Sequence, residues 1–331
     1  MKKAVIMAGG FGTRLRPLTM SIPKPMVPVA NIPMIEHILN LLKKHNITEI
    51  VCVLYFQPEK ITDYFGDGSK FGVKMEYVLA VADYGTAGAV RNAAEHLDEQ
   101  FIIISGDVLT DFDISAALKF HEDNGSQATI LLTRVPNPLA YGIVMTKENG
   151  AITRFLEKPS WGEVFSDTIN TGIYILEPEV LKMIPYQKEF DFSKDLYPAM
   201  LEEKRPLFGY ITDGYWRDIG NLTEYQIASQ DVLLGKVNID VRGEKQGNVY
   251  IGKNATIAET AVLKGMVVIG DNTTIGENAE ISDCIIGSKV SIGAHASVSG
   301  CVLWDNVEVG AGASLTNDVV CNDTKIGEGA T

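Results

Sequence analysis

With 331 residues, 46% of them hydrophobic, the chain is long enough for a substantial core and for one large or two moderate domains. Its formal net charge of -13 and its isoelectric point of about 4.9 argue against general attraction to nucleic acid or to anionic membranes, so an anionic ligand must be held by local groups. No apolar segment has the length of a signal-peptide core or a transmembrane helix, and the four cysteines lack C-x-x-C spacing, which predicts a cytoplasmic protein without a disulfide or zinc framework.

Residues 1–235 alternate short apolar runs with amphipathic stretches, the pattern expected of parallel strands connected by helices. We expect strands at Ala4–Ala8, Ile50–Tyr55 and Phe101–Ser105, and a helix over Pro33–Lys44 with Pro33 in its first turn. The run Phe101–Ser105 is apolar enough for a central strand buried on both faces, and it ends at Gly106-Asp107. Because ligands of open α/β sheets bind outside the carboxyl ends of the strands, Asp107 should converge with the glycine-rich loop that follows Ala8.

Later in the same region, the patterns indicate a hairpin. Strands at Gly142–Thr146 and Ala151–Leu156 flank Asn149-Gly150, a dipeptide that tolerates the positive φ angles of a tight turn. Further strands are expected at Thr168–Leu176 and Leu207–Ile211, with one helix opening at Pro178 and another over Asn221–Leu234, where Asn221 and Glu224 have capping-box spacing. The first domain, residues 1–235, is therefore predicted to be α/β with a mixed sheet.

A polar linker at 236–248 precedes a region, 249–331, in which aliphatic residues recur at every sixth position. The positions are Ile251, Ile257, Leu263, Ile269, Ile275 and Ile281, then after one five-residue step Ile286, Ile292 and Val298, continued by Val309, Leu315 and Ile326. Such hexads build a parallel β-helix with three short strands per coil and each aliphatic residue in a narrow core. An antiparallel sandwich would need period-two alternation and regular turns, which the region lacks. We therefore expect a parallel β-helix, and we predict that its coils are of the left-handed type.

The last hexad, Ile326–Thr331, is followed by no capping helix, so its coil would leave unpaired backbone groups and an apolar end. We expect either that the chain is truncated there or that a partner covers this end. Stacked coils offer an extended surface, and assembly into a homo-oligomer or regulation is therefore a more natural role for this domain than chemistry.

The segment after the first strand carries the strongest candidate for ligand chemistry. Three glycines let the backbone approach a polyphosphate and turn its N–H groups inward, and they are Gly9, Gly10 and Gly12. Arg14 and Lys24, the latter held in a Pro-Lys-Pro segment, add positive charge. A Walker A motif is excluded because no Gly-Lys-Ser/Thr follows, and the dinucleotide fingerprint is excluded because Leu15 stands at its third glycine position. A strand-to-helix turn without a ligand would explain one glycine, but not three glycines with two cations.

The stretch Gly-Gly-Phe-Gly-Thr-Arg-Leu-Arg-Pro-Leu-Thr at 9–19, followed by Pro-Lys-Pro at 23–25, resembles the sugar-1-phosphate nucleotidylyltransferase family and matches its signature throughout. The likeness extends over the N-terminal domain and the hexads. Through Pro-Lys-Pro-Met-Val-Pro-Val and Pro-Met-Ile-Glu-His at 33–37, the chain is similar to mannose-1-phosphate guanylyltransferases, including the form fused to a phosphomannomutase-like domain. The resemblance implies a Rossmann-like nucleotidyltransferase domain, and it is compatible both with a chain that stands alone and with a longer parent chain that continues into such a C-terminal domain.

In that family a sugar-1-phosphate oxygen attacks the α-phosphorus of a nucleoside triphosphate and pyrophosphate leaves, a reaction that needs positioning and charge neutralisation more than proton transfer. The resemblance implies that Arg14 binds the leaving phosphates and Lys24 the reacting ones. It assigns Asp107 and Asp218 as ligands of Mg2+, an ion that prefers a few carboxylates together with substrate oxygens and water. Without a ligand, Asp107 would be a helix cap and Asp218 a turn residue.

The family pattern also implies two groups of binding residues. The nucleotide would contact Ala8, Gly9, Gly10, Gly12, Thr13, Arg14 and Lys24, and near its base and ribose Gly85, Thr86 and Ala87. The sugar phosphate would contact Gly142, Glu157, Lys158, Asn170 and Thr171. Glu157 can accept hydrogen bonds from sugar hydroxyls and Lys158 can pair with the phosphate, although a surface ion pair is the alternative for both.

The substrates favoured by this resemblance are GTP and mannose 1-phosphate, giving GDP-mannose, with thymidylyl-, adenylyl- or uridylyltransfer to glucose 1-phosphate as alternatives. A regulatory subunit that senses a nucleotide sugar without turnover is a second hypothesis, against which the retained cations and aspartates count. Acyl transfer by the β-helix, with His295 as the base, is a third. The other histidines have no paired metal-ligand spacing.

Overall fold

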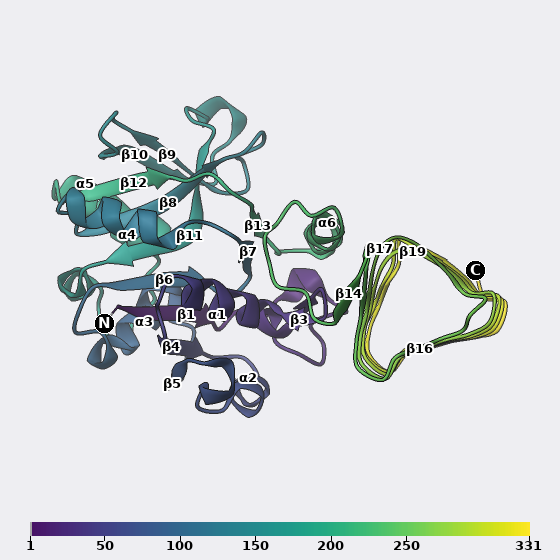
Figure 1. Ribbon diagram of the computed structural model, residues 1–331. Helices are drawn as coiled ribbons and strands as arrows, with labels where there is room; N and C mark the ends of the chain where they lie inside the picture. The colour runs from purple at the N-terminus through teal and green to yellow at the C-terminus, as the bar shows by residue number, and fades with distance from the viewer. Residues whose placement is uncertain (1) are drawn as a thin grey trace. The chain divides into compact units, whose positions relative to one another are not determined.

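A computed structural model describes residues 2–331 (Figure 1). Packing divides the described chain into two compact units, of which the first contains residues 2–11, 22–26 and 38–218 and the second contains residues 12–21, 27–37 and 219–331. The helix before residue 235 and two short N-terminal segments thus pack with the β-helix. The domain limits at 235 and 248 stay predictions from the sequence.

The first unit is built on a nine-stranded mixed sheet with the strand order β10-β9-β11-β6-β1-β4-β5, in which β8 also pairs with β11 and β12 pairs with β8. The strands are β1 Lys3–Ala8, β4 Glu49–Leu54, β5 Lys74–Leu79, β6 Phe101–Ser105, β8 Ala128–Arg134, β9 Gly142–Thr146, β10 Ile152–Glu157, β11 Thr168–Leu176 and β12 Leu207–Ile211. Strands β6, β1, β4 and β5 are parallel, whereas β11 is antiparallel to β6 and β8. The predicted α/β class and mixed sheet are confirmed.

The α-helices are α1 Met34–Lys44, α2 Pro58–Phe65, α3 Gly85–Asn92, α4 Ile114–Asp123, α5 Tyr197–Glu202 and α6 Leu222–Leu233. Short helical turns occur at η1 Thr13–Leu15, η2 Lys24–Met26, η3 Ser69–Phe71, η4 Ala94–His96, η5 Trp161–Glu163, η6 Pro178–Met183 and the π-helix η7 Phe192–Leu196. The N-terminus of α6 is capped as expected, since the Asn221 side chain accepts a hydrogen bond from Glu224 N over 3.0 Å.

Three local expectations differ from the structure. Pro33 belongs to strand β3 Ile32–Pro33, because it pairs with Pro28 of β2 Pro28–Val29, and the helix begins only at Met34. Strand β4 ends at Leu54 and not at Tyr55 as expected, and Tyr55 lines a cavity instead. The segment after Glu177 opens at Pro178 as predicted, but as a 3-10 helix.

The second unit contains stacked β-helix coils, which Figure 1 shows in triangular outline. Its strands are β14 Glu244–Gln246, β15 Val249–Ile251, β16 Thr256–Ile257, β17 Val262–Ile269, β18 Thr274–Ile275, β19 Glu280–Ile286, β20 Ser291–Ile292, β21 Ser297–Ser299, β22 Val302–Leu303, β23 Glu308–Val309, β24 Ser314–Thr316, β25 Val319–Val320 and β26 Lys325–Ile326. From β15 onward each strand pairs in parallel with the equivalent strand of the next coil. The left-handed sense of the coils stays a prediction.

The predicted hexad residues form ladders along the β-helix. One ladder runs through Ile257, Ile275, Ile292, Val309 and Ile326. The coils approach closely at the glycines that follow these residues, since a Cβ on Gly293, which follows Ile292, would lie 2.5 Å from Ala311 N of the next coil. The glycines of the hexads therefore permit the stacking distance, and the aliphatic residues fill the core.

Helix α6 and the hairpin β2–β3 are hydrogen-bonded to the β-helix within the second unit. Trp304 Nε1 donates to Tyr225 OH over 2.8 Å, and Tyr225 OH donates to the Pro28 carbonyl oxygen over 2.8 Å. Asn31 Nδ2 donates to the Ile286 carbonyl oxygen over 2.7 Å. These bonds contribute to the packing of residues 27–37 with the C-terminal part of the chain. No helix among residues 2–331 has the length and hydropathy that crossing a bilayer requires.

Candidate active site

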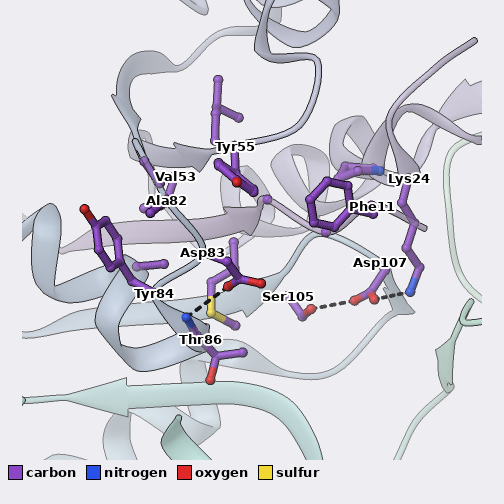
Figure 2. A pocket seen from close by; sticks show the side chains of 18 of the residues that line it. Phe11, Lys24, Val53, Tyr55, Ala82, Asp83, Tyr84, Thr86, Ser105 and Asp107 are labelled. Carbon is purple, nitrogen blue, oxygen red and sulfur yellow. Dashed lines mark hydrogen bonds and ion pairs between the residues drawn. The ribbon is translucent and has the colours of Figure 1, made fainter. Parts of the chain in front are cut away.

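A cavity of about 320 Å³ opens at the carboxyl ends of β1, β4 and β6 in the first unit (Figure 2). Its lining residues are Met7, Gly9, Gly10, Phe11, Lys24, Pro25, Val53, Leu54, Tyr55, Ala80, Ala82, Asp83, Tyr84, Gly85, Thr86, Ala89, Ser105, Asp107 and Asp191. Six of the predicted site residues are among them: Gly9, Gly10, Lys24, Gly85, Thr86 and Asp107.

Parallel pairing of β1 with β6 brings the glycine loop to Asp107. Met7 is opposite Ser105, and Gly106 N donates to the Met7 carbonyl oxygen over 2.9 Å. A Cβ on Gly106 would lie 2.8 Å from that oxygen, so only glycine allows this close approach between the two strand ends. The predicted convergence of the loop and Asp107 is confirmed.

Two carboxylates face the ammonium group of Lys24. Lys24 is only 8% exposed, and its Nζ forms an ion pair with Asp107 Oδ2 and lies 3.6 Å from Asp218 Oδ1. Asp218 reaches this position because β13 Trp216–Asp218 pairs antiparallel with β7 Val108–Thr110, which places Asp218 opposite the residue that follows Asp107. Two aspartates from distant segments thus converge on the Lys24 ammonium group, and their assignment as Mg2+ ligands stays a prediction from the family resemblance.

The pKa of Asp107 reflects two opposing influences. Burial raises the pKa, whereas the Lys24 ammonium and the Ser105 hydroxyl, which donates to Asp107 Oδ1, lower it. The lowering influences together exceed the effect of burial, so the pKa of Asp107 lies below the usual aspartate value. Asp107 is therefore a carboxylate at neutral pH.

The start of α3 forms another wall of the cavity and is held by a second segment. Gly85 has φ +67°, and a Cβ there would lie 2.8 Å from the Phe190 carbonyl oxygen, which accepts hydrogen bonds from Ala87 N and Gly88 N at 3.0 Å each. The Thr86 hydroxyl donates to Asp191 Oδ2 over 2.8 Å. The small residues of this loop are thus required by its contact with residues 190–191, and Ala87 itself is fully buried.

The predicted sugar-phosphate residues lie on β9, β10 and β11. Gly142 is opposite Glu157 in the β9–β10 pair, and a Cβ on Gly142 would lie 2.6 Å from Glu157 Oε2. Burial raises the pKa of Glu157, which the nearby Lys158 partly opposes. Asn170 Nδ2 lies 3.1 Å from both Ser193 Oγ and Tyr174 OH. The Thr171 hydroxyl donates to the Leu131 carbonyl oxygen over 2.7 Å.

The sequence of this chain matches two models of known protein families. The family model described as nucleotidyl transferase matches residues 3–234, and the one described as the EIF2B subunit epsilon LbH domain matches residues 246–331. The chain belongs to the sugar-1-phosphate nucleotidylyltransferase family.

The relatives of this chain are described with different substrates. A UTP-glucose-1-phosphate uridylyltransferase of Synechocystis is 39% identical, over 76% of this chain and 69% of its own length. A mannose-1-phosphate guanylyltransferase of Mycobacterium tuberculosis is 34% identical, over 79% of this chain and 73% of its own length. A solved structure from Bacillus anthracis, described as a glucose-1-phosphate thymidylyltransferase in complex with a sucrose, has 27% identity and a TM-score of 0.65 and covers 72% of this chain and 98% of its own.

The donor set near Lys24 fits a divalent cation of the kind that the nucleotidylyltransferase signature implies. Asp107 and Asp218 direct carboxylate oxygens at the same positive charge, and Mg2+ in phosphoryl-transfer sites takes one or two carboxylates and completes its shell with phosphate and water. Among residues 2–331 no group of three or more His, Cys, Asp or Glu side chains is arranged for metal binding. A metal at this site would therefore depend on substrate oxygens.

The remaining residues of the nucleotidylyltransferase signature are not among those that line this cavity, and some of them belong to the second unit. Ala8 is buried at the end of β1. Gly12, Thr13 and Arg14 fall in the segment that packs with the second unit, where Gly12 has φ +62° and accepts a hydrogen bond from the Thr19 hydroxyl over 2.7 Å. The roles of these residues stay predictions. His295 occupies an exposed coil corner with φ +61°.

Several lining residues were missed by sequence reasoning. Asp191 has only the local signature of a helix cap, and its side chain does accept hydrogen bonds from Ser193 N and Lys194 N. Tyr55 and Asp83 follow strands β4 and β5, so the rule that sites form at carboxyl ends of parallel strands could have identified them. Phe11, inside the signature itself, stacks edge-on against Tyr55 with ring centroids 5.5 Å apart.

Proposed function

We propose that this chain transfers a guanylyl group from GTP to mannose 1-phosphate, with release of pyrophosphate and formation of GDP-mannose. The observation that carries the proposal is the convergence of Asp107 and Asp218 on Lys24 at the edge of a cavity that the signature glycines line. Glycine N–H groups and a lysine suit a polyphosphate, and paired carboxylates suit the metal that accompanies it.

Guanylyl transfer, rather than transfer of another nucleotide, is supported by relatives named mannose-1-phosphate guanylyltransferase from Mycobacterium tuberculosis, rice and Arabidopsis thaliana, which are 34% to 35% identical to this chain. Uridylyl or thymidylyl transfer to glucose 1-phosphate is the alternative, in line with the names of the Synechocystis and Bacillus anthracis proteins.

In the proposed reaction, a phosphate oxygen of mannose 1-phosphate attacks the α-phosphorus of GTP. A new P–O bond forms there while the bond from the α-phosphorus to the bridging oxygen breaks, and the bonding electrons leave with pyrophosphate. The backbone of Gly9 and Gly10 approaches the triphosphate, Lys24 neutralises charge at the reacting phosphates and Arg14 binds the leaving ones. No side-chain nucleophile is required.

Asp107 and Asp218 would hold Mg2+, which when bound offsets negative charge on the α-phosphate. Glu157 would accept hydrogen bonds from sugar hydroxyls, and Lys158 would pair with the sugar phosphate. Gly142 and Asn170 would complete that pocket, with Thr171 holding its backbone through the bond to Leu131. The β-helix would serve assembly, as a homo-oligomer, or regulation.

Pyrophosphate release from the purified chain tests the proposal, with GTP, UTP, dTTP and ATP each paired with mannose 1-phosphate and with glucose 1-phosphate in the presence of Mg2+. We expect the highest kcat/KM for GTP with mannose 1-phosphate. No release with that pair, but release with another, would reassign the substrates within the family. Nucleotide-sugar binding without release from any pair would indicate a sensing subunit instead.

A further inference from the structure

We infer that Asp83 recognises the base: its carboxylate accepts hydrogen bonds from the N1–H and 2-amino groups of guanine and so makes the site selective for GTP. The inference rests on the proposed nucleotidyl transfer and adds to it a residue that determines the base.

The cavity has two chemically different parts. Lys24, Asp107 and Ser105 lie together at one part, where the phosphates belong, and Figure 2 shows Val53, Ala82 and Tyr84 at the other. Between them the Asp83 side chain projects into the open space below Tyr55 (Figure 2). A nucleotide with its phosphates at Lys24 therefore directs its base and ribose toward Asp83.

Hydrogen-bonding capacity also singles out Asp83. Among the lining residues the ionisable carboxylates are Asp83, Asp107 and Asp191. Asp107 is bonded to Lys24 and Ser105, and Asp191 accepts bonds from the Thr86 hydroxyl and from two backbone N–H groups. Asp83 is exposed and, within residues 2–331, takes a single hydrogen bond, from Gly85 N to its Oδ1 at 3.1 Å. A carboxylate has about four lone-pair sites, so most of the acceptor capacity of Asp83 is left for a ligand.

Much of the neighbouring wall is apolar, although the tyrosines Tyr55 and Tyr84 also line the cavity. Val53, Leu54, Ala80, Ala82 and Ala89 contribute apolar side chains, which suit the faces of a flat ring but donate no hydrogen bonds. A negative charge in a cavity that also holds a polyphosphate opposes binding by Coulomb repulsion. That cost is offset only when the ligand brings donors to the carboxylate.

The five common bases differ in the donors that they offer. Guanine carries an N1–H and a 2-amino group side by side, which match the two oxygens of one carboxylate in a charge-assisted pair. Adenine and cytosine place an amino group beside a bare ring nitrogen, whose lone pair a carboxylate repels. Uracil and thymine offer one N–H between two carbonyl oxygens. Paired acceptance by Asp83 therefore favours guanine over all four.

The substitution Asp83→Asn tests this assignment with GTP and xanthosine triphosphate, in which a carbonyl oxygen replaces the 2-amino group. The amide of the variant can accept from N1–H and donate to that carbonyl. We expect kcat/KM for GTP to fall roughly 10- to 100-fold and the preference to move toward xanthosine triphosphate, since hydrogen bonds to charged groups contribute about 1.5–3 kcal/mol. In the unchanged protein, inosine triphosphate, which lacks the 2-amino group, should be used less well than GTP.

Asp98→Asn is the matched control, because Asp98 is an exposed carboxylate outside the cavity that pairs with Lys3, and its neutralisation removes the same charge. It should leave the ratio of GTP to xanthosine triphosphate unchanged. An Asp83→Asn protein that keeps the original ratio would overturn the inference, as would an unchanged protein that prefers UTP or dTTP to GTP.

Equilibrium binding of GTP and xanthosine triphosphate is measured by calorimetry on the unchanged protein and on Asp83→Asn. This measurement separates the inference about Asp83 from the proposed function. A change of preference in binding with no turnover from any substrate pair would support Asp83 and defeat the proposed activity. Turnover with GTP but no change of preference would defeat the role of Asp83 alone. Failure of the unchanged protein to bind GTP would defeat both.

Discussion

The Thr86 hydroxyl donates a hydrogen bond to Asp191 Oδ2 over 2.8 Å and thereby fastens the first turn of α3 to the N-terminus of η7. The same segment continues to Ser193, whose Oγ accepts a hydrogen bond from Asn170 Nδ2 over 3.1 Å. Residues proposed to contact the nucleotide and residues proposed to contact the sugar phosphate are thus supported by one short piece of chain. Small displacements of residues 190–194 should affect both pockets.

Replacing Thr86 with valine keeps the shape of the side chain and removes the hydroxyl. The variant loses the bond to Asp191 and the one that Thr86 Oγ1 accepts from Phe192 N at 3.1 Å. With about 1 kcal/mol lost, we expect the KM for the nucleoside triphosphate to rise roughly fivefold with a smaller change in kcat. Initial rates of pyrophosphate release at varied triphosphate concentration measure both constants.

Thr62→Val is the control for this substitution, because the Thr62 hydroxyl donates to the Glu59 carbonyl oxygen within helix α2 and Thr62 does not line the cavity. It should leave the KM unchanged. Equal KM values for the Thr86 and Thr62 variants would show that the α3 loop needs no hydroxyl.

The sequence predicted the β-helix better than it predicted the cavity, for a physical reason. A hexad is a local signal, because each aliphatic residue repeats the environment of its neighbours one coil away, and the ladder from Ile257 to Ile326 follows that spacing. Asp191 carries no such signal, since its partner Thr86 is 105 positions away and only the fold brings them together. Likewise, pairing with Pro28 outweighed the local preference of Pro33 for a first helical turn.

Neutralising Asp107 should abolish most turnover. Asp107→Asn keeps an acceptor for the Ser105 hydroxyl but removes the charge that faces Lys24 and that would bind Mg2+. We expect kcat to fall at least about 100-fold, with the remaining activity needing more Mg2+, because charge stabilisation is a large part of this kind of catalysis. Pyrophosphate release across a Mg2+ titration, together with circular dichroism, measures the effect.

Asp123→Asn serves as the comparison, since Asp123 forms an exposed ion pair with Lys119 on α4. Its kcat should equal that of the unchanged chain. If Asp107→Asn retained full activity at the same Mg2+ concentration, the metal assignment would be wrong.

Gly142→Ala should impair the sugar pocket selectively. The added Cβ would lie 2.6 Å from Glu157 Oε2 and 2.8 Å from Phe155 Cζ, so the Glu157 carboxylate must move. We expect the KM for the sugar phosphate to rise about tenfold while the KM for the triphosphate stays constant. Gly162→Ala, where an added Cβ meets nothing within 4 Å, should change neither constant, and a similar effect of both substitutions would count against a role for Glu157.

Stability should decrease on acidification because of buried His37. Burial lowers the pKa of His37 below its ordinary value, although its bond to the Val29 carbonyl oxygen and the nearby Glu36 carboxylate act in the other direction. As pH falls below about 6.5, His37 binds a proton in the unfolded chain but stays neutral in the folded chain. The free energy of unfolding therefore decreases until the pH passes the pKa of His37 in the folded protein.

Melting temperatures measured between pH 8 and pH 5 check this expectation. In His37→Gln the amide can still donate to Val29 but does not titrate, so its melting temperature should depend less steeply on pH. Because burial also lowers the pKa of His121, part of the dependence will remain. Identical pH profiles for the two proteins would exclude His37 as a source of acid sensitivity.

Truncation of one buried ladder residue should destabilise the β-helix far more than truncation of an exposed aliphatic residue on another of its strands. Ile281 is 1% exposed and stands between Leu263 and Val298 in adjacent coils, whereas Val262 is 41% exposed. Ile281→Ala should cost about 2–5 kcal/mol, because the coils above and below cannot close the space left between them, and Val262→Ala should cost under about 1 kcal/mol. Urea unfolding followed by far-UV circular dichroism gives both values, and equal losses would mean that the aliphatic residues of the hexads do not form a packed core in solution.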